Sequence, residues 1–385
     1  MKRYLEDQLR TDLVSKMVIL TGPRQVGKTT LSRQLLADHV SSQYLNYDIP
    51  AHRKVLLEQT WSKNAALLVF DEIHKMPQWK PWLKGAFDGR TAFSDGAQQM
   101  LVTGSARMDT FRQTGESLAG RFYKLRLHPI SVREWCEQTG ATPARAIAHL
   151  LDRGGFPEPC LALDDRMAAR WRTDYFNSLV REDVMEFSRI NEVNGMRVFA
   201  DALRSRVGSP LSIASISRDM AVSPKTLSRY LEILEALFIV FTVRPWHHNI
   251  TRATLQQPKV YFFDTGLVLG NEGTRFENLV ACHLLKQVHW QQDAFGKSVD
   301  LHYLRTKDGT EVDFALSDAS QAEPTLSHLI ECKVADAKPH SALVRFAAQW
   351  TGAQSVQIVR DLRVEEDRNG IQIRDAASWL NQLDV

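Results

Sequence analysis

The residues best suited to chemistry begin with a glycine-rich segment near the N-terminus. Residues 22–29 fit the pattern G-x-x-x-x-G-K-[ST], directly after an apolar run and directly before a helical pattern. In this pattern backbone N–H groups wrap phosphates, the lysine reaches the β- and γ-phosphates, and the final hydroxyl binds Mg²⁺. The sequence therefore predicts a nucleotide-binding loop, with Thr29 as a metal ligand. Its residues are Gly22, Pro23, Arg24, Gln25, Val26, Gly27, Lys28, Thr29 and Thr30.

Two adjacent carboxylates follow a second apolar run at residues 65–70. Asp71 and Glu72 stand at the carboxyl end of a predicted buried strand, where ligands of parallel α/β sheets bind. We expect Asp71 to hold Mg²⁺ through water and Glu72 to orient and polarise the water that attacks the γ-phosphate. Adjacent acids also cap helices, but their place downstream of Lys28 favours the catalytic interpretation.

A second set of acids lies in strand-like segments near the C-terminus. Residues 311–316 alternate, which puts Glu311 and Asp313 on one face, and the segment around Glu331 pairs that acid with Lys333 in the same way. If the two strands are neighbours, Asp313, Glu331 and Lys333 converge. Two carboxylates and a lysine can bind Mg²⁺, generate an attacking hydroxide and stabilise a pentavalent phosphate. The alternative is a polar face without chemistry that only binds a partner.

A third group of residues is basic. Residues 211–221 predict a short amphipathic helix, and Ser223 with Pro224 predicts the start of a second helix that continues over 225–236. Wing strands are expected at 238–243 and 259–263. A winged helix-turn-helix that binds DNA is predicted, although such modules also serve as lids or protein contacts. The side chains expected to meet phosphates and base edges are Lys225, Thr226 and Arg229.

Alternating strands and helices must position the phosphate loop. Short apolar runs that are too continuous to alternate predict strands buried on both faces of a parallel sheet. The alternation of strand and helix predicts a doubly wound α/β domain. A long helical region is expected at residues 163–206. The strands are expected at 17–21, 44–47, 65–70 and 100–103, and the helices at 28–38, 50–59 and 79–93.

Composition narrows the class of protein. With 385 residues, 44% hydrophobic and 24% charged, the chain is neither disordered nor a single small module. No apolar stretch approaches the roughly 20 residues of a membrane helix, the N-terminus is acidic where a secretory segment would be apolar, and the four cysteines are far apart. We expect a cytoplasmic protein with no membrane partner. The net charge of +3 is positive over residues 1–270 and negative over 271–385, so a phosphate-rich partner is expected upstream.

Taken in order, the motifs resemble those of AAA+ ATPases, in particular predicted bacterial and archaeal ATPases with a nuclease-like C-terminal domain of unknown function. The resemblance implies ATP and Mg²⁺ as ligands and DNA as a partner. It implies a P-loop AAA+-like doubly wound parallel sheet at 1–155, a helical lid or linker at 156–195, a winged helix-turn-helix at 196–268, and a PD-(D/E)xK restriction-endonuclease-like α/β domain at 269–385. The segments that carry it are GPRQVGKTTL at 22–31, FDEIHKMPQW at 70–79, VTGSAR at 102–107, ESLAGRF at 116–122, GGFPEP at 154–159, FFDTGL at 262–267, EVDF at 311–314 and IECK at 330–333.

The same resemblance assigns further roles. The polar sensor of the γ-phosphate falls at Ser105, with Thr103 as second choice. Arg121 is the arginine that contacts phosphate, from its own subunit or from a neighbour in a homo-oligomer, and Glu277 takes the place of the helix acid of the nuclease fold. The expected function is ATP-dependent control of a DNA-binding winged helix and a nuclease-like domain. The alternative is an ATP-gated protein-interaction switch whose nuclease-like domain is inactive.

Overall fold

The computed structural model describes residues 1–93, 96–104, 118–179, 193–247, 256–320 and 324–385. The chain divides into two compact units. The first comprises residues 1–128 with 236–238, and the second comprises residues 129–235 with 239–385. Within the described ranges, no helix is both long and apolar enough to cross a membrane.

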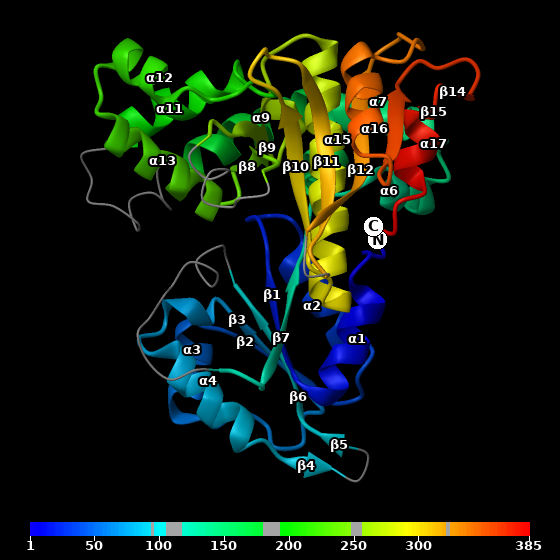
Figure 1. Ribbon diagram of the computed structural model, residues 1–385. Coiled ribbons are helices and arrows are strands. Elements are labelled where there is room, and N and C mark those ends of the chain that lie inside the picture. The colour runs from blue at the N-terminus through cyan, green and yellow to red at the C-terminus, as the bar shows by residue number, and fades with distance from the viewer. Residues whose placement is uncertain (94–95, 105–117, 180–192, 248–255, 321–323) are drawn as a thin grey trace. The chain divides into compact units, whose positions relative to one another are not determined.

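The first unit is built on a parallel sheet of five strands in the order β2-β3-β6-β1-β7 (Figure 1). Strands β1 and β3 are buried along their whole length, as their continuous apolar sequences predict. Because all five strands run the same way, their carboxyl ends share one edge of the sheet, where ligands bind. The strands are β1 Met17–Thr21, β2 Ser42–Asn46, β3 Leu67–Asp71, β6 Gln99–Thr103 and β7 Phe122–Arg126, beside a small hairpin of β4 Ala92–Phe93 and β5 Gly96–Ala97.

Three helices of the first unit, α2, α3 and α4, lie where helices were predicted, whereas α1 was not predicted. The helix predicted at 79–93 ends early, because Gly89 caps it and the hairpin follows. Strand β7 was not predicted: its alternating, partly exposed residues lack the continuous apolar run of β1. The helices are α1 Glu6–Ser15, α2 Lys28–Ala37, α3 Pro50–Glu58, α4 Trp79–Asp88 and the short 3-10 helix η1 Ile73–Lys75.

The second unit contains a sheet of eight strands in the order β14-β15-β13-β12-β11-β10-β8-β9. Strands β8 and β9, predicted as a wing, do pair antiparallel. However, β8 also pairs in parallel with β10, so the hairpin belongs to the same sheet as the strands of the predicted C-terminal domain. The strands are β8 Val240–Pro245, β9 Lys259–Phe262, β10 Val299–Arg305, β11 Glu311–Asp318, β12 Thr325–Lys333, β13 Gln354–Val359, β14 Glu366–Arg368 and β15 Ile371–Asp375.

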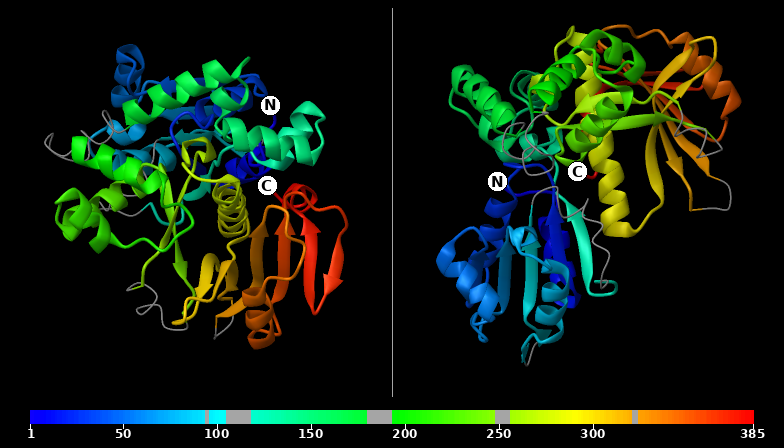
Figure 2. Two further views of the ribbon diagram at one scale, coloured as in Figure 1. Left: turned by 90° about the horizontal axis from the view of Figure 1, so that it is seen from above. Right: turned by 90° about the vertical axis from the view of Figure 1, so that its left-hand side faces the viewer.

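Two helices of this unit cover opposite faces of the sheet (Figure 2). Helix α15, Glu272–Phe295, contacts β9, β10 and β12, whereas α16, Ser341–Gln349, contacts β11, β12 and β13. Leu343 and Phe346 of α16 pack with Val312 and Leu329 in an apolar cluster, so the polar side chains that alternate with Val312 face α15. The remaining elements are α6 Val132–Thr139, α7 Pro143–Arg153, α8 Pro157–Cys160, α9 Asp165–Ser178, α11 Val193–Arg204, α12 Ile213–Met220, α13 Pro224–Ala236, η3 Thr265–Leu267 and α17 Ala376–Asn381.

Candidate functional site

The predicted phosphate loop joins β1 to α2, and two of its glycines are required by geometry. Gly22 has φ +139°, and a Cβ atom there would lie 2.3 Å from the carbonyl oxygen of Leu127. Gly27 precedes α2 with φ +103°, in the region that glycine adopts most readily. The chain thus turns sharply from the strand to the helix N-terminus, the place where protein folds bind phosphate.

Lys28 folds over its own loop. Its Nζ donates hydrogen bonds to the carbonyl oxygens of Gly22, at 2.9 Å, and Pro23, at 2.6 Å. Arg3 holds the loop as well, because its guanidinium donates to the carbonyl oxygens of Val26 and His128 at 2.9 and 2.5 Å. Phosphate oxygens would take the place of the two carbonyl acceptors of Lys28. A lone arginine near the terminus belongs to no motif, so sequence reasoning missed Arg3.

Asp71 is the polar centre of the sheet edge. Its Oδ2 accepts hydrogen bonds from the hydroxyls of Thr29 at 3.1 Å and Tyr44 at 2.5 Å, and from the Asn46 amide at 3.4 Å. Its Oδ1 accepts from the hydroxyl of Thr103 at 2.5 Å. Burial raises the pKa of Tyr44 to about 12, and the hydrogen bond to Asp71 adds to the rise, so this hydroxyl keeps its proton. The buried carboxylate of Asp71 is therefore held in one orientation by four side chains.

The predicted Mg²⁺ ligands of the first unit come together in this arrangement. The hydroxyl of Thr29 and the carboxylate of Asp71 lie beside each other at the edge of the sheet, next to the phosphate loop. Hydroxyl and carboxylate oxygens are the donors that Mg²⁺ prefers, usually alongside water and substrate phosphates. The residues present therefore fit a magnesium ion bound together with a nucleotide.

Glu72 adopts a strained backbone conformation beside Asp71. Its φ of +56° lies in the left-handed region, which costs a non-glycine residue about 1–3 kcal/mol. The backbone N–H of Glu72 donates to the carbonyl oxygen of Thr103 and to Asp71 Oδ1, both at 3.1 Å. Its carboxylate lies 3.3 Å from Lys75 Nζ and 3.6 Å from His74 Nε2. Burial raises the pKa of Glu72, while the charge of Lys75 lowers it, so the predicted base has the perturbed environment common in active sites.

The two remaining residues predicted for the ATP site have different outcomes. Ser105 lies outside the described residues, whereas Thr103 ends β6 between β1 and β3 and bonds to Asp71. Arg121 precedes β7 and binds both carboxylate oxygens of Asp88, at 2.8 and 2.9 Å. Because β1 and β7 are parallel, Arg121 lies at the edge of the sheet opposite the phosphate loop, about five residues of strand or roughly 16 Å away. It does not contact the phosphate site of its own chain, and an action on a neighbouring subunit stays a prediction.

The predicted acids of the second unit do converge. Strands β11 and β12 are antiparallel neighbours, and the backbone N–H of Asp313 lies 3.3 Å from Glu331 Oε2. The N–H of Cys332 donates to Asp313 Oδ2 at 2.9 Å, and Lys333 Nζ donates to Glu331 Oε1 at 2.6 Å. Burial and the nearby carboxylates of Glu277 and Glu331 raise the pKa of Asp313. Burial alone would also raise the pKa of Glu331, but its neighbours His340 and Lys333 lower it.

A buried lysine lies among these acids, which the sequence did not indicate. Lys259 Nζ lies 2.7 Å from Glu311 Oε1, 3.2 Å from Glu277 Oε1 and 3.6 Å from Asp313 Oδ1, and its side chain is 1% exposed. Burial alone would lower the pKa of Lys259, but the three carboxylates outweigh it and raise that pKa. The hydroxyl of Tyr261 donates to Glu277 at 2.7 Å. Lys259 was predicted only as the start of a wing strand; a lysine opening an apolar run was the available signal.

The cluster of the second unit does not fit the predicted Mg²⁺. Asp313 and Glu331 were predicted as its ligands, yet their oxygens already face the ammonium groups of Lys259 and Lys333 and two backbone N–H groups. The described residues contain no group of three or more His, Cys, Asp or Glu side chains that could hold a metal ion. No chemical step that uses a metal is therefore assigned to this cluster.

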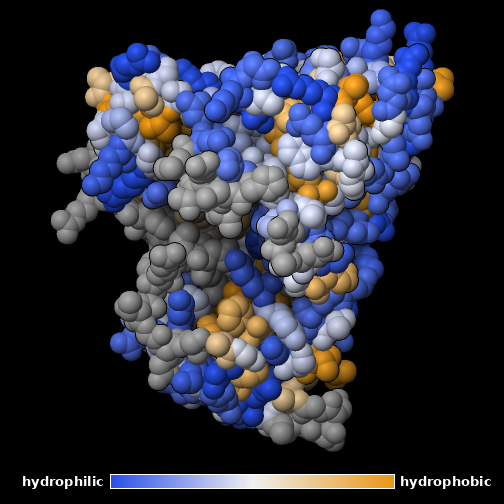
Figure 3. Space-filling view, viewed as in Figure 1, coloured by the Kyte–Doolittle hydropathy of each residue, from blue (hydrophilic) through white to orange (hydrophobic). Residues whose placement is uncertain are grey.

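The predicted DNA-contacting face starts at the N-terminus of α13. The hydroxyl of Ser223 caps this helix by accepting from the backbone N–H of Thr226 at 3.1 Å, as predicted. Lys225 and Arg229 are exposed, whereas the Thr226 hydroxyl lies 2.8 Å from that of Ser223. Figure 3 shows hydrophilic residues interspersed with apolar patches on the surface over α12 and α13. Two of the three predicted side chains are thus available to a polyanion, and Thr226 is partly engaged in the cap.

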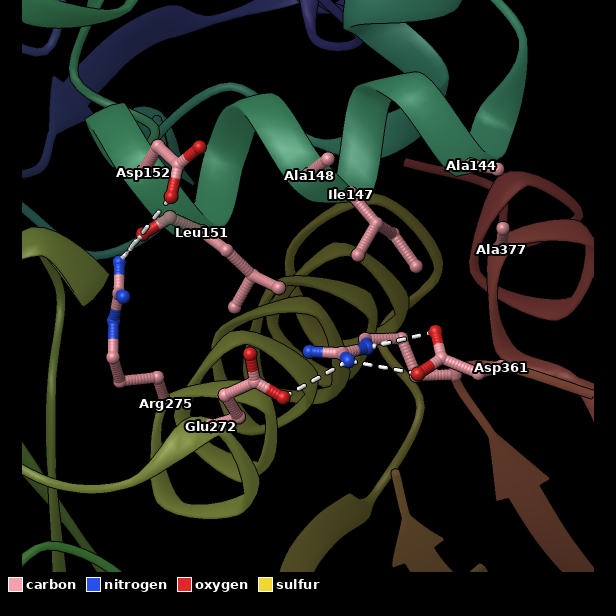
Figure 4. A pocket seen from close by; sticks show the side chains of 10 residues that line it. Ala144, Ile147, Ala148, Leu151, Asp152, Glu272, Arg275, Asp361 and Ala377 are labelled. Carbon is pink, nitrogen blue, oxygen red and sulfur yellow. Dashed lines mark hydrogen bonds and ion pairs between the residues drawn. The ribbon is translucent and has the colours of Figure 1, made fainter. Parts of the chain in front are cut away.

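A further cavity of about 320 Å³ lies between α7, the start of α15 and the end of β13 (Figure 4). Arg275 reaches the carbonyl oxygen of Leu151, and Arg360 joins Glu272 and Asp361 at 3.1 and 2.8 Å. The lining carries more acidic than basic side chains, with Asp152 also present. This cavity is therefore poorly suited to phosphate, and the phosphate loop remains the candidate nucleotide site.

Comparison with known families agrees with the geometry of the first unit. Residues 14–136 match the family described as AAA domain, and they contain the phosphate loop, Asp71 and Glu72. The first unit is thus an α/β fold whose parallel sheet resembles that of P-loop ATPases. Residues 144–274 and 272–375 match two families described as domains of unknown function, DUF8612 and DUF4143.

Individual similar proteins include curated relatives whose names state no activity and one solved Walker-type ATPase. Over 254 residues the chain is 30% identical to uncharacterized proteins of Mycobacterium tuberculosis and Mycobacterium bovis. The match covers 66% of this chain and 55% of each relative, so the chain spans about half the length of these curated relatives. A Walker-type ATPase of Pyrococcus abyssi is 14% identical, with a TM-score of 0.42 over 68% of this chain and 93% of that chain. That likeness is too distant to bear on function.

Proposed function

We propose that this protein binds ATP with Mg²⁺ at the phosphate loop and hydrolyses it. One observation carries the proposal: Lys28, Thr29 and Asp71, from two different strand ends, converge at the carboxyl edge of a parallel sheet. The match of residues 14–136 to an AAA domain supports it. The choice of ATP over GTP rests on family resemblance, because the loop reads phosphates and not the base.

Each residue at the carboxyl edge of the sheet has a separate role in binding or hydrolysis. Lys28 exchanges its loop carbonyls for phosphate oxygens, and the loop N–H groups and the start of α2 hold the remaining negative charge. Glu72 orients and polarises the attacking water, and Thr103 and Tyr44 keep the neighbouring Asp71 in place. Thr29 and Asp71 would hold a Mg²⁺ ion, which would supply positive charge beside the phosphates. Most of the rate enhancement in such sites comes from positioning and electrostatic stabilisation.

Equilibrium binding tests the first part of this proposal. Fluorescent ATP is titrated against the wild-type protein and Lys28→Ala, with Lys16→Ala as the control because Lys16 lies beside Tyr123 at the other end of β1. We expect Lys28→Ala to lose at least about tenfold in affinity, equivalent to about 1.4 kcal/mol, and the control to bind normally. Equal binding by Lys28→Ala and the wild type would contradict the assignment of the loop.

We further propose that α13 contacts DNA and that nucleotide state controls this contact. The exposed Lys225 and Arg229 at the start of a capped helix, after a turn from α12, support a recognition helix. Replacing both with alanine is expected to weaken DNA binding uniformly across sequences and to reduce the slope of log K against log salt by about one per lost phosphate contact. Lys307→Ala, an exposed lysine between β10 and β11, is the control. Wild-type protein that does not bind DNA at low salt would refute this part.

A second candidate function is an ATP-gated switch that binds a protein partner through the second unit. The observation that favours it is the ion-paired state of Asp313, Glu331 and Glu277, because a cluster already neutralised by lysines is suited to structure rather than to DNA cleavage. If the protein does not bind DNA and DNA leaves its ATPase rate unchanged, the protein-binding switch is favoured over the proposed contact of α13 with DNA.

A further inference from the structure

The acids of the second unit already enclose a cation. The ammonium of Lys259 is within 2.7–3.6 Å of carboxylates on α15 and at two positions of β11. Its side chain is 1% exposed, so water contributes little to balancing these charges. A buried charge is retained in proteins when it is paired and hydrogen-bonded, as this one is.

We propose that Lys259 is the resident cation of this cluster, standing where an acid–acid–lysine nuclease would hold a divalent metal, so that the second unit takes no Mg²⁺ there. The disagreement with the sequence-based expectation comes from β9, which inserts a lysine into the face formed by β11, β12 and α15. This inference goes beyond ATP binding and does not depend on it.

The balance of charge supports the proposal. An oxygen site for Mg²⁺ needs carboxylates that are not already neutralised, in near-octahedral geometry at about 2.0–2.1 Å. Here the acids face nearly as many permanent cations, and a metal ion beside Nζ would meet a like charge. Four carboxylates, Glu277, Glu311, Asp313 and Glu331, face the three permanently charged side chains of Lys259, Lys333 and Arg305.

Backbone packing closes the cluster further. Gly208 has φ +76°, and a Cβ atom there would lie 2.8 Å from Glu277 Oε2. The hydroxyl of Tyr261 occupies the other oxygen of Glu277 at 2.7 Å. The helix acid assigned by family resemblance is therefore largely covered, with 17% of its side chain exposed, and it is engaged with Lys259 and Tyr261. It joins α15 to β9 as a structural contact.

The test measures Mn²⁺, a probe for Mg²⁺ sites, by electron paramagnetic resonance on full-length, nucleotide-free protein. Every sample carries Asp71→Asn, which removes the carboxylate of the other candidate metal site, so failure of the ATP proposal and failure of this one are separable. The parent protein and Lys307→Met, an exposed-lysine control, are expected to show no specific binding at millimolar Mn²⁺. Lys259→Met is expected to gain a specific Mn²⁺ site, with an affinity at least about tenfold above any residual binding by the parent, because the substitution frees three carboxylates from the Lys259 ammonium.

Specific Mn²⁺ binding by the parent that disappears with Asp313→Asn would overturn the proposal, as would a folded Lys259→Met that gains no Mn²⁺ site. If Lys259→Met unfolds without metal, its melting temperature with and without Mn²⁺ is the readout, and stabilisation by Mn²⁺ is expected. Should that variant not fold under either condition, the parent titration decides alone: absence of binding supports the proposal, and Asp313-dependent binding refutes it.

Discussion

Thr103 offers the sharpest test of how the ATP site is built. Its hydroxyl donates to Asp71 Oδ1 at 2.5 Å from the end of β6, the strand between the phosphate loop and Asp71. The side chain is completely buried. Thr103→Val keeps the volume and the strand preference but removes the donor. The substitution therefore isolates one hydrogen bond to a carboxylate.

The magnitude follows from the other donors to Asp71. A hydrogen bond to a charged group contributes about 1.5–3 kcal/mol. Thr29 and Tyr44 remain on the other carboxylate oxygen and limit its rotation, so we expect the low end of that range. At about 1.4 kcal/mol for each factor of ten, kcat should fall roughly 10- to 30-fold. Affinity for ATP should change little, because Thr103 is not part of the phosphate loop.

Steady-state phosphate release at saturating Mg²⁺ and ATP measures this effect, with ATP affinity measured separately. Thr21→Val is a matched control: Thr21 ends the neighbouring strand β1, is equally buried, and its hydroxyl has no hydrogen-bond partner in the described structure. The control should retain the wild-type rate within about twofold. A Thr103→Val rate equal to wild type, or an equal loss in both variants, would refute the assignment of Thr103.

Three further predictions concern pH, the loop and stability. Glu72 acts as a carboxylate, and because its pKa is raised, hydrolysis is lost as the pH falls through that pKa. Lys75 lowers the pKa of Glu72, so Lys75→Ala should move the acid limb of the kcat profile to higher pH. An unmoved acid limb would contradict the role of Glu72. Gly22→Ala places a Cβ atom 2.3 Å from Leu127 O and should abolish ATP binding while circular dichroism stays unchanged; normal binding would show that the loop geometry is wrong. The Lys286 ammonium is 2% exposed and lies 2.6 Å from the Glu134 carboxylate, which Glu134→Ala removes. In urea unfolding, Glu134→Ala should lower the stability of the second unit by about 3–5 kcal/mol, whereas Glu137→Ala, which removes an exposed carboxylate, should cost under about 1 kcal/mol. Similar unfolding midpoints for the two variants would contradict this expectation.

Local motifs made the first unit predictable. The phosphate loop and Asp71 were identified because each depends on a few adjacent residues and on the strand that precedes them. Tyr44 and Asn46 were missed because their contact with Asp71 depends on β2 being the neighbour of β3, which the sequence of either strand does not specify. Ser105, the first choice for the sensor, lies outside the described residues, whereas Thr103, the second choice, ends β6 and donates to Asp71.

The second unit was predictable only in part. Alternation placed Asp313 on one face and the pairing of β11 with β12 brought Glu331 to it, as expected. Lys259 could not be foreseen, because the pairing of β8 with β10 that brings its hairpin into the sheet is a contact between distant segments. A single buried lysine thereby reverses the chemistry inferred from the acids alone.

We propose above all that the edge formed by Lys28, Thr29 and Asp71 hydrolyses ATP. Mg²⁺-dependent phosphate release by purified wild-type protein, compared with Lys28→Ala and with Glu72→Gln, tests it most directly. The claim predicts release by wild type and at least about a hundredfold less by both variants, equivalent to about 2.7 kcal/mol of lost transition-state stabilisation. Phosphate release that persists in Lys28→Ala, or that is absent from folded wild-type protein that binds ATP, would contradict it.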